Sequence, residues 1–212
     1  LLRDGELVAA VAEERLNRKK HYAGFPAQAI RKVLEIGGLG IGDVDSVALG
    51  HHPSANLPAK LRHSVLNPGE GILAARNALR RRRKVRSLAD LFSYECGFER
   101  QECRFDVRHV EHHLAHVSSS FYCSDFEEAA AFSFDASGDF VSTLFGSCSN
   151  SGISTLKRVY LPHSLGYFYT ALCQFIGFDR YGEEYKVMGL AAYGRPKYRR
   201  AFQEILVPEP NG

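Results

Sequence analysis

Two short apolar runs with a polar loop between them constrain the fold more than any other feature of this sequence. Residues 129–134 (Ala-Ala-Ala-Phe-Ser-Phe) are small or aromatic, and residues 141–146 (Val-Ser-Thr-Leu-Phe-Gly) are rich in β-formers. Runs of this length, bounded by turn residues, are typical of strands. We therefore expect a buried strand, a hairpin loop over Asp135–Asp139 and a second strand, with Gly138 giving the turn its conformational freedom. Backbone N–H groups of such a turn can bind phosphate oxygens.

A pair of histidines precedes the first run. His112 and His116 are four residues apart in a segment, 112–122, that contains neither Gly nor Pro and is compatible with a helix. Side chains at this spacing lie on one helix face, so both imidazoles can bind one metal ion. A metalloprotease helix needs Glu after the first histidine, and His113 stands there instead, which disfavours that chemistry. A third ligand is required, and Asp135 is the best candidate.

Each of these features also has a purely structural explanation. His112 can cap a helix or face solvent, and Asp135–Asp139 can be an ordinary turn. The charged run Glu13–His21 is either a solvated loop or an anion-binding edge in which two acidic residues hold Lys20. The basic cluster Arg80–Lys84 can bind phosphate or nucleic acid, but such clusters more often form a solvated helix face.

The remaining pattern indicates an α/β protein. A hairpin is expected at Asp4–Gly5, and residues 181–186 are expected to form a polar loop before a glycine-containing stretch that approaches a ligand. Lys186 either contacts phosphate or pairs with Glu183 or Glu184. The other expected elements are helices over 26–36, 74–91 and 165–176, the last capped by Ser164, and strands over 44–49, 107–110 and 155–160.

Composition narrows the class of protein. Hydrophobic residues make up 45% of the 212 and charged residues 24%, as in ordinary globular proteins. The net charge of +3 does not indicate a nucleic-acid partner. The five cysteines are widely spaced without a CxxC pair, which favours reduced thiols and a cytoplasmic protein. The sequence contains neither a signal peptide nor an apolar run of about eighteen residues, so no membrane span is expected.

Several stretches together resemble the amino-terminal domain of the nodulation and antibiotic O-carbamoyltransferases. The most telling are Glu-His-His-Leu-Ala-His at 111–116 and Phe-Ser-Phe-Asp-Ala-Ser-Gly-Asp at 132–139. The others are residues 4–15, 18–21, 164–169 and 186–194, and all occur in the order of the family. Only residues 53–105 lie outside the resemblance, and we interpret them as a variable helical insertion.

The resemblance implies a fold and an activity. The fold is an actin-like ATPase (ribonuclease H-like) lobe with a mixed sheet and a helical insertion. Residues 1–212 would be a fragment of the amino-terminal domain, without the second lobe or the YrdC-like domain. In the family the YrdC-like domain makes carbamoyl-adenylate from carbamoyl phosphate and ATP. The domain resembled here then transfers the carbamoyl group to a hydroxyl of a small-molecule acceptor, so we expect the isolated fragment to be weakly active or inactive.

The resemblance also implies roles for particular residues. The metal ligands would be His112, His116 and Asp135, and the family favours Fe(II), with Zn or Mn also compatible with these ligands. The catalytic residues would be Lys20, His112 and Asp135, and the residues that bind ATP as carbamoyl-adenylate would be Lys20, Gly138, Asp139 and Lys186. Ala136 departs from the glycine common in the family, which would restrict the turn.

Two other functions are compatible with the same motifs. The first is threonylcarbamoyl transfer to tRNA, in which Arg80–Lys84 would bind RNA. The second is an actin-like module that binds a partner in response to a nucleotide and needs no metal.

Overall fold

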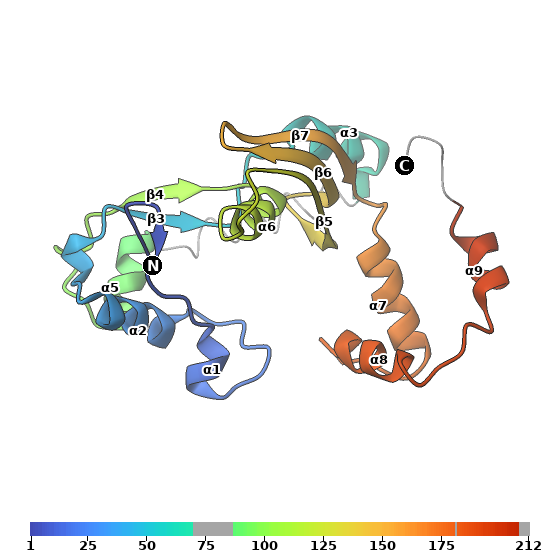
Figure 1. Cartoon of the computed structure of the whole chain (residues 1–212), viewed down its shortest axis with the longest axis horizontal. Coiled ribbons are helices and arrows are strands. Elements are labelled where there is room, and N and C mark those ends of the chain that lie inside the picture. The colour runs from blue at the N-terminus through green and yellow to red at the C-terminus, as the bar shows by residue number, and fades with distance from the viewer. Residues whose placement is uncertain (70–86, 181, 208–212) are drawn as a thin grey trace. The chain divides into compact units, whose positions relative to one another are not determined.

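The computed structural model describes residues 1–69, 87–180 and 182–207, which form a mixed α/β protein with small sheets (Figure 1). The chain divides into two compact units, Leu1–Asp125 (unit 1) and Phe126–Gly212 (unit 2). The basic cluster Arg80–Lys84 and most of the helix expected over 74–91 lie outside the described residues. Within the described ranges, no helix combines the length and the apolar character needed to cross a bilayer.

Unit 1 begins with the expected hairpin. Strands β1 (Leu2–Arg3) and β2 (Glu6–Leu7) pair antiparallel. Asp4 and Gly5 between them have positive φ angles of 53° and 89°, which a tight two-residue turn requires. The charged run that follows is helical in its first part, α1 (Glu13–Asn17), rather than a loop throughout.

The core of unit 1 is aromatic and aliphatic. Helix α2 (Ala27–Gly37) starts after Pro26 and ends at Gly38 in the left-handed conformation, close to the expected bounds. It contacts α5 (Leu88–Cys96), which extends beyond the expected end at residue 91. The Phe92 ring on α5 lies with its centroid 4.8 Å from that of Phe105. The buried cluster comprises Leu34, Ile41, Phe92, Cys103 and Phe105.

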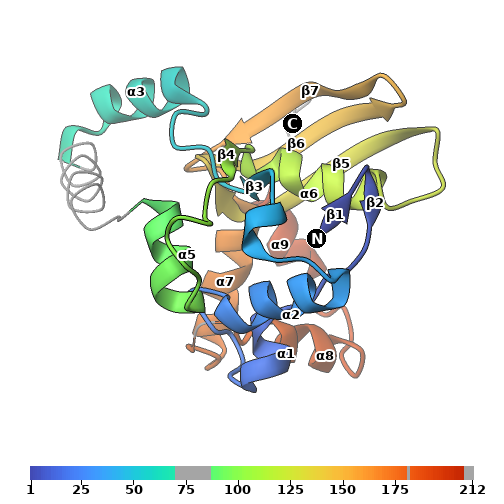
Figure 2. The same cartoon turned by 90° about the vertical axis from the view of Figure 1, so that its left-hand side faces the viewer.

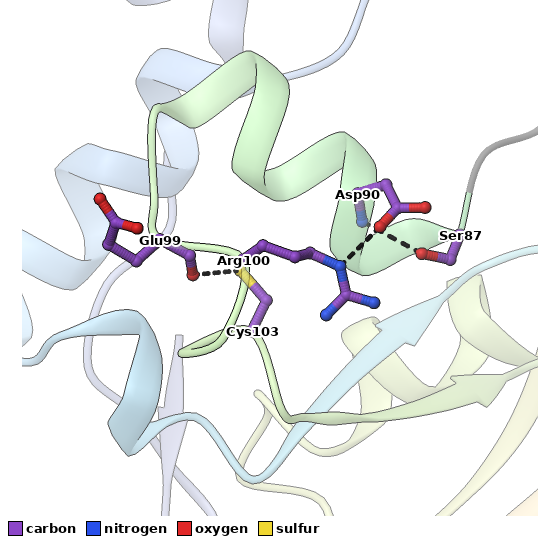
Figure 3. Close-up of polar contacts among 5 residues, drawn as sticks. All are labelled: Ser87, Asp90, Glu99, Arg100 and Cys103. Atoms are coloured by element: carbon purple, nitrogen blue, oxygen red, sulfur yellow. Dashed lines mark hydrogen bonds and ion pairs between the residues drawn. The ribbon is translucent and has the colours of Figure 1, made fainter.

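Polar contacts hold the segment that leads from α5 back to the sheet (Figure 3). Ser87 caps α5, because its hydroxyl accepts a hydrogen bond from the backbone N–H of Asp90. The Asp90 carboxylate pairs with Arg100, and this contact lowers the pKa of Asp90. The thiol of Cys103 donates to the carbonyl of Glu99 at 3.7 Å.

Two parallel strands position the histidine helix. Strand β3 (Ser46–Leu49) pairs with β4 (Asp106–His109) in the register Ser46↔Asp106 to Leu49↔His109. Helices α3 (Leu57–Leu66) and α5 lie between them in the chain, within the stretch expected to be a helical insertion. Because the strands are parallel, their carboxyl ends meet at one edge, and α6 (His112–Phe121) starts just after it (Figure 2). The strand and helix expected here are confirmed.

Among the described residues, unit 2 contains a three-stranded antiparallel sheet, β5 (Glu128–Gly138), β6 (Val141–Ser149) and β7 (Gly152–Tyr160). The expected hairpin is confirmed, but its turn is elsewhere. Asp139 and Phe140 adopt positive φ angles of 52° and 75°, whereas Gly138 pairs with Val141. The prediction that Gly138 provides the turn was therefore wrong. The pairing is interrupted between Phe134 and Gly138, which moves the turn one residue later.

Burial in this sheet also differs from the expectation. Strand β5 was expected to be buried, yet Phe132 and Phe134 are 57% and 61% exposed. Register pairs Phe132 with Phe145 of β6, and the ring centroid of Phe132 lies 5.0 Å from that of Phe145 and 5.4 Å from that of Phe134. The buried strand is β6 instead, where Leu144 is fully buried.

The helices of unit 2 follow the sheet. Ser164 caps α7 (Leu165–Phe175) by accepting from the backbone N–H of Tyr167, as expected. Helix α8 (Glu184–Ala191) begins within the predicted polar loop and replaces its second half, and Thr170 of α7 donates to Glu184 at the start of α8. The last described helix is α9 (Arg199–Ile205).

The reactivity of the cysteine thiols can test which parts of the chain are buried. All five lie in the described part of the chain as free thiols, and Cys123 is exposed while the other four are buried. Burial raises the pKa of Cys96 to about 11 and also raises the pKa of Cys103 and Cys173. Because the thiolate is the reactive form, we expect a thiol reagent at pH 8 to label Cys123 first, measured by mass spectrometry. Rapid labelling of Cys96 without denaturant would contradict this arrangement.

Candidate functional site

The two histidines of α6 converge. The Nε2 atoms of His112 and His116 are 3.1 Å apart, and their ring centroids are 4.6 Å apart. With metal–nitrogen bonds of about 2.0–2.1 Å, two ligands of one ion have nitrogens roughly 3.0 to 3.4 Å apart, depending on coordination geometry. The observed separation therefore suits two ligands of a single cation. His116 is exposed and His112 half-buried, so the pair is accessible.

The histidine between them faces the interior. His113 is fully buried, with its ring centroid 5.3 Å from that of His112 and 6.3 Å from that of His116. Val117 and Phe121 are the other buried residues of α6. One face of this helix is thus packed while the neighbouring face carries the candidate ligands, as i, i+4 spacing requires.

The start of α6 is attached to the end of β3. The backbone N–H of Val110 donates to the carbonyl of Leu49 at 2.8 Å. The ring nitrogen Nδ1 of His109 lies 2.8 Å from the carbonyl oxygen of His51. A Cβ added to Gly50 would lie 3.4 Å from the Cβ of Ala115, so β3 and α6 approach closely here. These contacts fix where the helix begins.

Asp135 belongs to unit 2, in the irregular part of β5. Its Oδ1 accepts a hydrogen bond from the backbone N–H of Ala136 at 2.6 Å. Ala136 does not have a positive φ, so the expectation that alanine would restrict the turn is not supported. Asp139, at the turn itself, is buried and adopts the left-handed conformation that aspartate tolerates.

The first turn of α7 holds the acidic segment Asp135–Asp139. The Ser164 hydroxyl donates to the carbonyl of Ala136 at 2.7 Å, and the hydroxyls of Ser137 and Tyr167 are 3.0 Å apart. Gly166 lies so close that an added Cβ would be 2.5 Å from the backbone nitrogen of Ala136. The segment therefore has a defined conformation set by the helix behind it.

The two predicted lysines lie in different units. Lys20 is exposed beyond α1, and the carboxylate of Glu14 accepts from the backbone N–H of His21. The acidic residue thus orders the backbone beside Lys20. Lys186, on α8, donates to Glu183 at 2.6 Å. This hydrogen bond lowers the pKa of Glu183 and raises that of Lys186, so the structure shows the pairing alternative for Lys186.

Of the predicted site residues, the structure brings His112 and His116 together within unit 1 and holds Asp135 beside α7 within unit 2. Gly138 and Asp139 lie at the turn between β5 and β6. Roles for Lys20 and Lys186 in binding a phosphate stay predictions. Sequence reasoning missed the support of the acidic segment by Gly166 and Tyr167. It also missed a contact between Asn56 and Glu111, for which the sequence contains no local signal because the residues are 55 positions apart.

Comparison with known proteins identifies the family of this chain. The family described as carbamoyltransferase N-terminus matches residues 1–207, so the chain belongs to that family. The chain is 34% identical over 202 residues to the uncharacterized protein sll1178 of Synechocystis sp., covering 93% of this chain and 33% of that protein. It is 33% identical over 213 residues to the nodulation protein NolNO of Sinorhizobium fredii, covering 100% of this chain and 30% of that protein.

A shorter match is 40% identical over 97 residues to the nodulation protein NolO of Bradyrhizobium diazoefficiens. It covers 45% of this chain and 18% of that protein. The chain thus spans about a third of the length of the relatives that it matches over most of its own length. The expected resemblance to the amino-terminal domain of the carbamoyltransferases, and to nodulation proteins, is confirmed.

Proposed function

We propose that this chain is part of an O-carbamoyltransferase that moves a carbamoyl group from carbamoyl-adenylate to a hydroxyl of a small-molecule acceptor. Carbamoyl-adenylate would be made from carbamoyl phosphate and ATP by a YrdC-like domain of the same protein. The observation that carries the proposal is the family match over residues 1–207. The mixed α/β units are compatible with actin-like ATPase lobes, the fold that the family implies.

A divalent cation would be held by His112 and His116 of unit 1 and Asp135 of unit 2. Imidazoles and carboxylates are common ligands of divalent cations, and the 3.1 Å separation of the two histidine Nε2 atoms within unit 1 supports a shared ion. This donor set suits Fe(II), Zn or Mn, with Fe(II) favoured by the family resemblance. A bound cation supplies positive charge that offsets phosphate charge and polarises the carbamoyl carbonyl.

The other proposed residues act on the nucleotide. Lys20 would add positive charge where negative charge develops during transfer. Gly138 and Asp139 would place the turn of the β5–β6 hairpin against the phosphates, where backbone N–H groups are suitable donors. Lys186 would bind a phosphate by breaking its salt bridge with Glu183 and pairing with a phosphate oxygen instead. This exchange is possible because the lysine side chain is 43% exposed.

The test uses the protein encoded by the whole reading frame beside the 212-residue chain. Each is supplied with ATP, carbamoyl phosphate and a panel of hydroxylated acceptors, and AMP release and carbamoylated product are measured. We expect acceptor-dependent AMP release by the whole protein and little or none by the 212-residue chain. Release that depends on tRNA and falls steeply with salt would favour threonylcarbamoyl transfer instead. Strong transfer by the 212-residue chain alone would refute the need for the rest of the protein.

A further inference from the structure

Two residues at helix starts bind each other instead of their own helices. Asn56 is the N-cap of α3 and Glu111 the N-cap of α6. Among the residues that the structure describes, neither side chain makes a capping hydrogen bond to a backbone N–H of its own helix. Instead, the Asn56 amide nitrogen donates to Glu111 Oε1 at 3.1 Å across 55 positions of sequence. Asparagine at an N-cap normally satisfies a local N–H group, so the contact between the Asn56 side chain and Glu111 is an unusual use of this position.

The backbone of Asn56 suits this role. Its φ of 57° and ψ of 29° are left-handed, a conformation that asparagine tolerates better than most residues. Asn56 is thus specialised both in conformation and in the use of its side chain. The residue stands at the start of the helical stretch between β3 and β4.

Glu111 transmits the contact to the candidate metal ligand. It is buried, with 9% of its surface exposed, and its carbonyl accepts the backbone N–H of Ala115 in the first turn of α6. His112 follows it directly in the chain. On the other side, Val110 is bound to Leu49 through the backbone. The start of α6 is therefore held at two adjacent residues, once by backbone and once by the Glu111 side chain.

We infer that Asn56 and Glu111 are positioning residues for the histidine pair. Their hydrogen bond fixes the first turn of α6, so that His112 points alongside His116 at the separation that suits one cation. This inference rests on the proposed function, because it treats the pair as cation ligands. Neither residue is among the proposed ligands of the cation. Removing groups that orient metal ligands typically weakens metal affinity by about 10–100-fold.

The test compares zinc affinity among variants of the 212-residue chain, measured by competition with a chromophoric chelator. Asn56→Gly retains the left-handed backbone but deletes the amide, and Asn56→Asp retains the shape but replaces the donor with a carboxylate. Glu111→Gln retains an acceptor oxygen. Asn67→Ala is the matched control, because the Asn67 amide donates to His63 within the last turn of α3. Thermal melting by circular dichroism follows the fold of each variant.

We expect both Asn56 variants to bind zinc about tenfold more weakly or worse, with melting within a few degrees of the parent. Glu111→Gln and Asn67→Ala should bind nearly as the parent does. Parent-like affinity in both Asn56 variants would overturn the inference while leaving the proposed metal site intact. If the parent chain itself binds no zinc, iron or manganese, the proposed metal site fails and the inference fails with it.

Discussion

Replacing His112 with alanine is expected to abolish zinc binding by the chain and to lower carbamoyl transfer by the whole protein by about two orders of magnitude or more. A bound cation contributes several kcal/mol of charge stabilisation, and each 1.4 kcal/mol is about a tenfold change in rate. One imidazole alone cannot replace a pair whose nitrogens lie 3.1 Å apart. His116→Ala should have the same effect. Metal content by mass spectrometry and AMP release are the two measurements.

The control for this prediction is another helical histidine of unit 1. His63 lies near the end of α3, and its Nδ1 is 3.4 Å from the side-chain amide nitrogen of Asn67, the C-cap of the same helix. His63→Ala should therefore retain both metal and activity. If His112→Ala and His116→Ala bind the cation with parent stoichiometry, the histidine pair is not the metal site. If His112→Ala loses both the metal and the fold, the test is repeated with His112→Gln, which retains most of the side-chain volume.

Gly166→Ala is expected to destabilise unit 2 and to disturb Asp135 at the same time. The added Cβ would lie 2.5 Å from the nitrogen and 2.6 Å from the Cα of Ala136, and 2.7 Å from the carbonyl carbon of Asp135. These are backbone atoms, so relief requires moving the acidic segment away from α7. Such overpacking costs about 1–3 kcal/mol. The sign of the change in the free energy of unfolding is diagnostic, because replacing glycine by alanine within a helix ordinarily stabilises the helix by about 1 kcal/mol.

The measurements are the urea midpoint and the zinc affinity of the same samples. Gly42→Ala is the matched control, because Gly42 lies in the 3-10 turn Ile41–Asp43 and an added Cβ would have no neighbour within 4 Å. We expect its midpoint to change little, since substitutions without new contacts usually stay within about 0.5 kcal/mol. A Gly166→Ala protein with a higher urea midpoint and unchanged zinc affinity would show that the acidic segment adapts without cost.

Local sequence signals predicted the histidine helix well. Four-residue spacing and the lack of Gly and Pro place His112 and His116 on one helix face, and this follows from helix geometry alone. The hairpin turn was misplaced because glycine was taken as the necessary residue. Aspartate also tolerates the left-handed conformation, and the irregular pairing after Phe134 shifted the turn to Asp139 and Phe140.

Other misses have different physical causes. An apolar run does not reveal which strand of a hairpin is buried, so Phe134 was expected inside although it is 61% exposed. Helix α8 was missed although Glu184 in its first turn favours the helix N-terminus electrostatically. The bond between Asn56 and Glu111 depends on the parallel pairing of β3 with β4, which no local pattern encodes.

The contrast between the β3–β4 sheet and the β5–β6–β7 sheet has a consequence for the order in which the molecule assembles. Strands β5, β6 and β7 follow one another through tight turns, so their pairing closes only short loops and proceeds quickly. Strands β3 and β4 pair only when the long chain segment between them closes into a loop. Closing this loop costs more conformational entropy than closing the short turns of the antiparallel sheet, so the pairing of β3 with β4 is slower. The beginning of α6 is anchored to Leu49 across that late junction. The nascent polypeptide should therefore gain the anchored start of α6, from which His112 follows, among the last native features of unit 1.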